Sequence, residues 1–340
     1  ALQFQNKQNA TFAAADGTKN EAWGGRTKVG NEVKNNTLTV TGGTLTQAAY
    51  GGLAENFTRD TAGNLNPAGN ATENKLVLNA GANTLNAYGA QVRTKGGSAA
   101  ENTALLLGGT VNGSLYGGAL TAVGAGGSAT KNKIELESGS VTGSVYGGAL
   151  TDAGATGSAT ANEITVKGGT VAGDVYGGFT NGSGATTGNT VNLGDGEHSL
   201  PTGTNIAGTI YGGNKADVTD NTLNVNTNAT AGNIANFDKL KFTLKDSTLN
   251  PANSVLRLTT GATNNLDWTK LEVDVTGLTV TPKSYEAYRV NLMDNANGVS
   301  FTKGATNTYA SSGAKQRTNG DLEYVIDTDN HTANAAQYVY

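Results

Sequence analysis

An aromatic residue followed by glycine recurs along the first two thirds of the chain, and it is the side chain best suited to bind a partner. In six of the seven copies a second glycine follows, as in Tyr116-Gly-Gly and Tyr146-Gly-Gly. A tyrosine ring is rigid and apolar with a polar tip, so an exposed row of rings suits sugars, a host protein or another copy of the chain. The candidate binding residues are Trp23, Tyr50, Tyr88, Tyr116, Tyr146, Tyr176 and Tyr211.

The direction of these rings depends on the short strand that carries each of them. If the strand is regular, Val141 and Val145 point inward and Tyr146 points outward, because side chains alternate along a strand. A bulge at Gly143 would reverse the alternation and bury the ring, and the loop that follows would cover it in a second arrangement. The sequence alone does not decide between these two structural interpretations and an exposed row of rings that binds a partner. The glycines after the ring are expected to permit a sharp turn with positive φ.

Residue patterns for catalysis were sought and not found. The two histidines, His198 and His331, stand alone in polar segments, so a histidine-based triad is not expected. The repeats "GGSAT" at Gly126–Thr130 and "TGSAT" at Thr156–Thr160 contain serine but lack the spacing of a nucleophile turn. We therefore predict a protein that is not an enzyme, with no catalytic residue.

Cofactor and metal patterns are also missing. The segment "NLGDGEH" at Asn192–His198 has no Lys-Ser/Thr pair to hold a phosphate, and Asp152, Asp174 and Asp195 do not recur in register as calcium ligands would. No cofactor and no metal ion are expected.

Composition excludes several classes of partner. The 340 residues carry a net charge of −4 with no cluster of lysine and arginine, so nucleic acid is not an expected partner. No apolar run approaches the length of a transmembrane helix, so this segment is not expected to insert directly into a membrane. The 49 glycines and only 4 prolines indicate many tight turns between ordered strands.

An asparagine precedes the aromatic residue by a fixed distance of 14 residues in the first six copies. The seventh copy runs from Asn189 to Tyr211, and Asn221 opens an eighth that lacks the aromatic residue. Equivalent residues of a solenoid stack from turn to turn, so we predict a structural ladder of asparagine side chains at a corner where asparagine adopts the left-handed conformation. The six asparagines are Asn9, Asn36, Asn74, Asn102, Asn132 and Asn162.

The elements that carry these residues are predicted to be short parallel strands. Apolar residues alternate with polar ones, as at Ile134 and Leu136, and each strand ends at a glycine turn. Such strands, repeated about every thirty residues, bury their apolar face only by stacking. We predict an all-β fold, a right-handed parallel β-helix, in preference to a β-sandwich or a β-propeller. Residues 1–233 are expected to form the repeat coils, and residues 234–340 the C-terminal coils and a capping segment.

The repeats resemble those of the passenger domains of bacterial autotransporters. The resemblance is carried by "GGTVNGSLYGG", "SGSVTGSVYGG" and "KGGTVAGDVYGG", and by three stretches within Asn233–Phe301: "NIANFDKLKFTL", "LRLTTGATNNLDWTKLEVDV" and "YRVNLMDNANGVSF". It implies a right-handed β-helix, a location at the bacterial cell surface or in the medium, and adhesion or self-association. Members of this family are secreted through an outer-membrane barrel, which this chain does not include.

These observations together predict a non-enzymatic extracellular surface protein that mediates adhesion or self-association. The expected partners are other copies of the chain, in an oligomer or filament, or a glycan or protein of a host or bacterial surface. One alternative is a polysaccharide-processing enzyme, which three acidic or basic side chains in one groove would support. The other alternative is an inert structural stalk.

Overall fold

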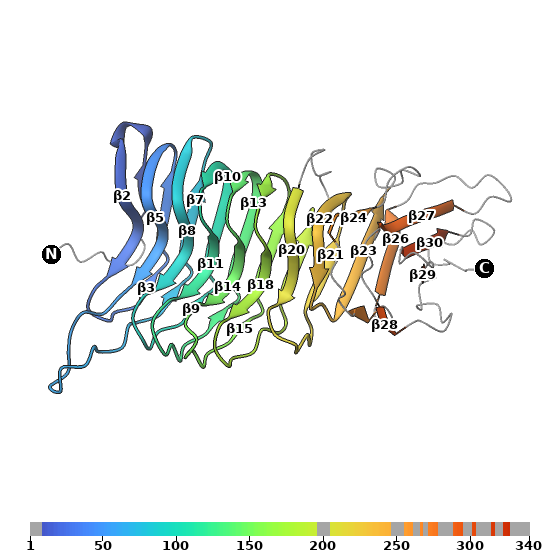
Figure 1. Cartoon of the computed structure of the whole chain (residues 1–340). Coiled ribbons are helices and arrows are strands. Elements are labelled where there is room, and N and C mark those ends of the chain that lie inside the picture. The colour runs from blue at the N-terminus through green and yellow to red at the C-terminus, as the bar shows by residue number, and fades with distance from the viewer. Residues whose placement is uncertain are drawn as a thin grey trace.

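The protein is an elongated β-solenoid whose turns follow one another from the N-terminal to the C-terminal end (Figure 1). The computed structural model describes residues 9–195, 205–245 and 255–260, together with the strand segments that lie between residues 266 and 326. Within these residues the only helix is a short 3-10 turn, Ala14–Asp16.

The strands of successive turns form rows that run along the solenoid: two long rows, and a shorter first row to which five successive turns contribute. The first row is a sheet of two-residue strands: β3 (Val33–Lys34), β6 (Ala71–Thr72), β9 (Ala99–Ala100), β12 (Ala129–Thr130) and β15 (Ala159–Thr160). The second row contains β1 (Asn9–Phe12), β4 (Thr37–Val40), β7 (Lys75–Leu78), β10 (Thr103–Val111), β13 (Lys133–Val141), β16 (Glu163–Val166), β19 (Thr190–Leu193), β21 (Thr222–Val225), β23 (Lys239–Lys245) and β26 (Leu271–Gly277). The third row contains β2 (Thr18–Thr27), β5 (Gly43–Ala54), β8 (Ala82–Val92), β11 (Leu115–Leu120), β14 (Val145–Leu150), β17 (Thr170–Val171), β18 (Val175–Thr180), β20 (Asn205–Gly213), β22 (Ala229–Ala235), β24 (Leu256–Leu258) and β27 (Tyr288–Asp294).

Strands of one row pair in parallel with equivalent residues in register. Ile134 of β13 lies beside Ile164 of β16, which lies beside Val191 of β19. The alternation in sequence explains the register, because a slip of one residue would turn the apolar residues to solvent. The apolar side chains of successive turns form one core that runs from Phe12 to Met293. The predicted class, an all-β parallel β-helix, is therefore confirmed.

The solenoid continues without a break through residues 233 and 234, which both lie in β22. The strands β23, β24, β26 and β27 continue the parallel stacking, and β25 (Leu266–Asp267) pairs with β28 (Phe301–Lys303). The pattern then changes. β30 (Leu322–Ile326) pairs antiparallel with β27, and β29 (Ala314–Gln316) pairs antiparallel with β30. β30 thereby covers an edge of β27 that would otherwise offer unpaired backbone groups to another chain, and β29 in turn covers β30.

No helix among the described residues has the length and apolar character needed to cross a membrane.

Candidate functional site

The structure brings the six predicted tyrosines into one continuous stack on the third row of strands. Neighbouring rings have centroids 4.6–5.2 Å apart and planes within 3–14° of each other, from Tyr50 to Tyr211. Trp23 lies in register with Tyr50 and packs against the same cluster of side chains. We call the six stacked rings the tyrosine column.

The rings lie on the outer side of the third row, as regular alternation predicts. Leu115 precedes Tyr116 and belongs to the main core, whereas Tyr116 packs in a separate cluster with Ala119 and Ala149. Both of these alanines are fully buried. The rings therefore lean over the strand and cover the alanines, so each ring is shielded on its inner side.

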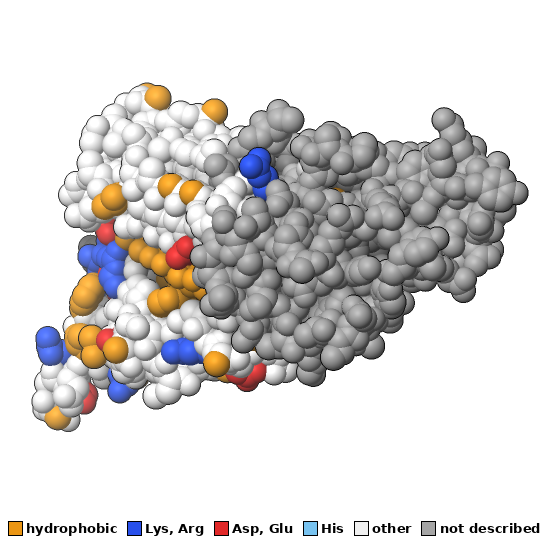
Figure 2. Space-filling model, turned by 45° about the vertical axis from the view of Figure 1, so that its right-hand side comes forward, with side chains coloured by type: hydrophobic (Ala, Val, Ile, Leu, Met, Phe, Trp, Pro, Cys, Tyr) orange, Lys and Arg blue, Asp and Glu red, His pale blue; other side chains and the backbone are white. Residues whose placement is uncertain are grey.

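The tyrosine column is not uniformly exposed, and the binding role of its members stays a prediction. Tyr50 is only 2% exposed and Tyr88 only 8% exposed, so neither contributes to an accessible surface. Tyr116, Tyr146 and Tyr176 are half-buried, as is Tyr211. Figure 2 shows a row of hydrophobic side chains across the described part of this face.

The stacking itself limits what the column can bind. Sugars and flat ligands approach the face of an aromatic ring, but inside the column each face lies against the next ring. Tyr116, Tyr146 and Tyr176 therefore have a stacked ring on both faces, whereas Tyr211, the last ring, has one on a single face. Phe179 packs edge-on against Tyr146 and Tyr176, with centroids 5.3 Å away in both cases. The tyrosine column thus forms a second hydrophobic cluster, on the outer side of the third row and separate from the main core.

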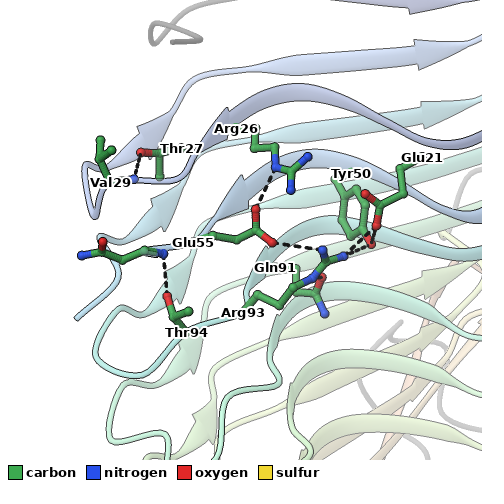
Figure 3. Close-up of polar contacts among 10 residues, drawn as sticks. Glu21, Arg26, Thr27, Val29, Tyr50, Glu55, Gln91, Arg93 and Thr94 are labelled. Atoms are coloured by element: carbon green, nitrogen blue, oxygen red, sulfur yellow. Dashed lines mark hydrogen bonds and ion pairs between the residues drawn. The ribbon is translucent and has the colours of Figure 1, made fainter. Parts of the chain in front are cut away.

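A cluster of charged residues closes the N-terminal end of the column (Figure 3). Glu55 is almost fully buried and accepts hydrogen bonds from Arg26 at 2.7 Å and Arg93 at 3.0 Å. Arg93 also donates to Glu21 at 2.9 Å and to the hydroxyl of Tyr50, and Tyr50 donates to Glu21 at 3.0 Å. We call Glu21, Arg26, Glu55 and Arg93 the arginine clamp.

The arginine clamp also covers the end of the aromatic stack. The guanidinium of Arg26 lies 4.7 Å from the ring centre of Trp23, and that of Arg93 lies 5.2 Å from the ring centre of Tyr50. Two arginines and two glutamates neutralise one another, which is the condition under which charges are tolerated with little exposure. Sequence reasoning missed the clamp because its residues occur once each and not in every repeat.

Burial raises the pKa of the phenols of Tyr50, Tyr88 and Tyr116, and burial together with the Asp174 carboxylate raises that of Tyr176. An ordinary tyrosine has a pKa of about 10, so below that pH the phenols are neutral in both folded and unfolded chains. Above it the unfolded chain loses these protons first, so stability present below pH ~10 is lost as the pH rises.

We therefore expect alkaline unfolding to accompany ionisation of Tyr50, Tyr88, Tyr116 and Tyr176. In a titration followed by tyrosinate absorbance, part of the 12 tyrosines should ionise near the ordinary pKa, and the rest only together with loss of the β circular dichroism signal. Ionisation of all tyrosines in one transition while the fold is intact would contradict this.

Seven buried asparagines form the predicted ladder, one turn above another. The Nδ2 of each donates to the Oδ1 of the next at 3.0–3.3 Å, and the backbone N–H donates to the same oxygen at 2.9–3.1 Å. Each Nδ2 also donates to a backbone carbonyl of the preceding segment, as Asn132 does to Ala99 at 3.0 Å. The members are Asn36, Asn74, Asn102, Asn132, Asn162, Asn189 and Asn221.

Two parts of the asparagine prediction are wrong. Asn9 is exposed and pairs with Thr37, one position past Asn36, so it does not occupy a ladder position. The left-handed residue is the one before each ladder asparagine, with φ between 54° and 66°, as at Lys131 and Ala161. The corner residue points away from the core and its type varies, so sequence repetition gave no sign of its conformation.

The glycine pair after each aromatic also has a different role from the predicted one. Neither Gly147 nor Gly148 has positive φ. A Cβ on Gly147 would overlap the carbonyl oxygen of Gly177 in the next turn, and a Cβ on Gly148 would overlap the side chain of Asn162. The glycines therefore let the backbone of the next turn and the asparagine ladder approach the third row closely.

The first glycine of the pair should tolerate substitution less than the second. Gly147→Ala forces apart two backbones, whereas Gly148→Ala meets a side chain, and the turn that contains Ala90 already has alanine at the second position. We expect Gly147→Ala to lower the free energy of unfolding by about 3 kcal/mol or more, and Gly148→Ala by clearly less. Urea unfolding of the two variants tests this, and equal losses would contradict it.

Two further ladders use the repeated serines. Ser114 and Ser144 lie two residues before their tyrosines, and each Oγ accepts the backbone N–H one turn later, at 3.3 and 3.1 Å. The serines of the "GSAT" repeats, Ser128 and Ser158, do the same at 3.2 and 3.1 Å. These serines are structural acceptors. Their recurrence at a fixed offset is the signal that would have identified them.

Groups of three or more His, Cys, Asp or Glu side chains that could hold a metal ion are absent from the part of the chain that the structure describes. His198 and His331 lie outside the described residues.

Comparison with known proteins identifies no relative: no family model, no curated protein and no solved structure matches this chain.

Proposed function

We propose that this chain is a non-enzymatic surface protein that acts by adhesion or self-association. The observation that supports the proposal is a contrast within each turn between repeated residues with structural roles and loops that vary. The repeated asparagines, serines and tyrosines are engaged in ladders and a stack that hold the turns together, whereas the loops between turns differ in length and composition. A rigid rod with variable side loops is a scaffold for presenting binding surfaces.

The resemblance of the repeats to autotransporter passengers supports a place outside the cell, on a bacterial surface or released from it. A long rod on such a surface carries its loops away from the cell envelope, where a host molecule or another copy meets them. We expect the loops to make the contacts, because the faces of the tyrosine column are already covered.

Among the described residues, the arginine clamp comes closest to the cluster of charged side chains that an enzyme site would need, because it brings four of them together. Within the clamp both oxygens of Glu55 bind arginine, and the shared oxygen of Glu21 binds Arg93 and Tyr50. A general acid or base needs a carboxyl group that is free to exchange a proton with substrate. The pairing favours a structural role for the clamp.

The proposal is tested with microscopic beads coated with the purified chain, compared with beads coated with an unrelated protein. We expect the coated beads to clump with each other or to adhere to layers of glycan or matrix protein. Light scattering over a wide concentration range, with negative-stain images of the same samples, separates the two modes. Beads that neither clump nor adhere would overturn the proposal.

A further inference from the structure

The tyrosine column is a continuous path of oxidisable rings along the outside of the solenoid. A phenol is one of the few protein side chains from which a strong oxidant removes a single electron. Successive rings from Tyr50 to Tyr211 have centroids 4.6–5.2 Å apart and nearly parallel planes, so their π systems face one another. Electrons pass readily between π systems in such contact, so an electron vacancy formed on one ring reaches the others.

The ring on which the vacancy comes to rest depends on proton acceptors. A phenol that has lost an electron is a strong acid, and it becomes a neutral radical once its proton has moved to a base within hydrogen-bonding reach. Within the described residues, two rings of the column donate to a carboxylate: Tyr50 to Glu21 at 3.0 Å, and Tyr176 to Asp174 at 3.0 Å. These two rings are the candidate resting places.

Positive charge disfavours the Tyr50 end of the column (Figure 3). The guanidinium of Arg93 lies 5.2 Å from the ring centre of Tyr50, and it donates to the Tyr50 hydroxyl and to Glu21. A cation beside the ring opposes the withdrawal of an electron, and the same cation already holds the Glu21 carboxylate. The arginine clamp thus makes Tyr50 the harder of the two rings to oxidise.

The Tyr176 end offers a carboxylate without a cationic partner. Oδ2 of Asp174 accepts from Tyr176, and Oδ1 accepts from the backbone N–H of Thr209 at 2.8 Å. In the part of the chain that the structure describes, no lysine or arginine forms an ion pair with Asp174. The equivalent residue one turn earlier is Ser144, so this carboxylate is a departure from the repeat. Asp174 is therefore placed to take the proton of Tyr176.

We propose that the tyrosine column collects oxidising equivalents from strong one-electron oxidants and holds them at Tyr176 as a neutral tyrosyl radical. The substrates are oxygen-centred radicals or metal complexes in a high oxidation state. The oxidant gains one electron from the ring that it meets, and the vacancy moves along the stack to Tyr176. The O–H bond of Tyr176 then breaks, and its proton moves to Oδ2 of Asp174, which becomes a neutral carboxylic acid. A one-electron reductant such as ascorbate restores the phenol when Asp174 returns the proton.

The first experiment locates the radical in the full chain. The oxidant is a photo-excited ruthenium tris-bipyridyl complex with a cobalt(III) ammine as electron acceptor, and a nitroso spin trap marks the radical for peptide mass spectrometry. We expect the largest share of adduct on Tyr176. Asp174→Asn keeps an oxygen for the N–H of Thr209 but removes the base, and should lower that share about tenfold. The matched control Asp152→Asn changes a carboxylate that accepts from the backbone of Gly124, outside the column, and should leave the share unchanged.

The second experiment tests passage along the stack and uses the absence of cysteine from the chain. Leu85 is 44% exposed on the strand that carries Tyr88, so Leu85→Cys provides a single attachment point for the ruthenium complex. Light should then place adduct on Tyr176, several rings away. Tyr146→Phe keeps a stacked ring that this oxidant does not oxidise, so most of the adduct should stay on the Tyr88 side of the break. Tyr211→Phe changes a ring beyond Tyr176 and should leave the distribution as in the labelled parent.

Circular dichroism establishes that each variant keeps the β fold of the parent. Adduct spread evenly over the exposed tyrosines, or unaffected by Asp174→Asn, would show that Tyr176 is not the resting place. A tethered complex that oxidises Tyr88 alone would rule out the relay, and the proposal with it. Adhesion and self-association are measured separately by the bead assay, so the proposed function stands or fails independently of these results.

Discussion

Replacing Asn132 with alanine is expected to lower the free energy of unfolding by about 3–5 kcal/mol. The side chain is fully buried, and it makes four hydrogen bonds of 3.0–3.1 Å: two that it donates, to Ala99 and Asn162, and two that its Oδ1 accepts from Asn102. Alanine removes all four. The backbone N–H and the amide of Asn102, and the acceptors at Ala99 and Asn162, are then left buried with partners lost, which costs more than the hydrogen bonds contribute when formed.

The matched control is Asn181→Ala. Asn181 is exposed, and its side chain makes one long hydrogen bond of 3.4 Å to the carbonyl of Thr151. Its loss should change the free energy of unfolding by no more than about 0.5 kcal/mol. Urea unfolding of both variants, followed by circular dichroism, gives the comparison. If the two variants had equal free energies of unfolding, the hydrogen bonds of the asparagine ladder would make no net contribution to stability.

The fold was predictable from the sequence because the same apolar pattern recurs in each repeat and the strands that it specifies pack against their own equivalents. Alternation at Ile134 and Leu136 sets which face of the strand is buried, and its return in the next repeat at Ile164 sets which strand lies alongside. The asparagine ladder was predictable for the same reason, since a buried amide that recurs in register has its counterpart as the nearest partner. Repetition thus carries information about stacking.

The remaining features depend on residues that do not repeat. The arginine clamp joins Glu21, Glu55 and Arg93, which come from three successive turns and lie up to 72 residues apart in sequence. Arg93 and Glu21 of the clamp contact Tyr50, and so the burial of Tyr50 could not be read from the tyrosine pattern. The long connection of 24 residues between Tyr50 and Asn74 likewise interrupts the repeat. In this molecule the repeated residues build the rod, and the features that the repeat pattern did not predict lie in what departs from the repeat.

Replacing Tyr116, Tyr146 and Tyr176 together with serine is expected to lower the free energy of unfolding by about 5 kcal/mol or more. The change removes four stacked ring contacts, with centroid distances of 4.6, 4.9, 5.2 and 4.7 Å, and both edge-on contacts of Phe179, and it uncovers the buried Ala119 and Ala149. Each half-buried ring contributes apolar burial in addition to stacking, so the losses accumulate along the column.

The control that isolates the rings from their hydroxyl groups is the triple phenylalanine variant. It keeps the stack and removes only hydroxyl contacts, such as the hydrogen bond of 3.0 Å from Tyr176 to Asp174, so its loss should stay within about 2 kcal/mol. Serine and phenylalanine variants of equal stability would mean that the rings are dispensable for folding. In that case the half-buried tyrosines would be the first surface to test for binding.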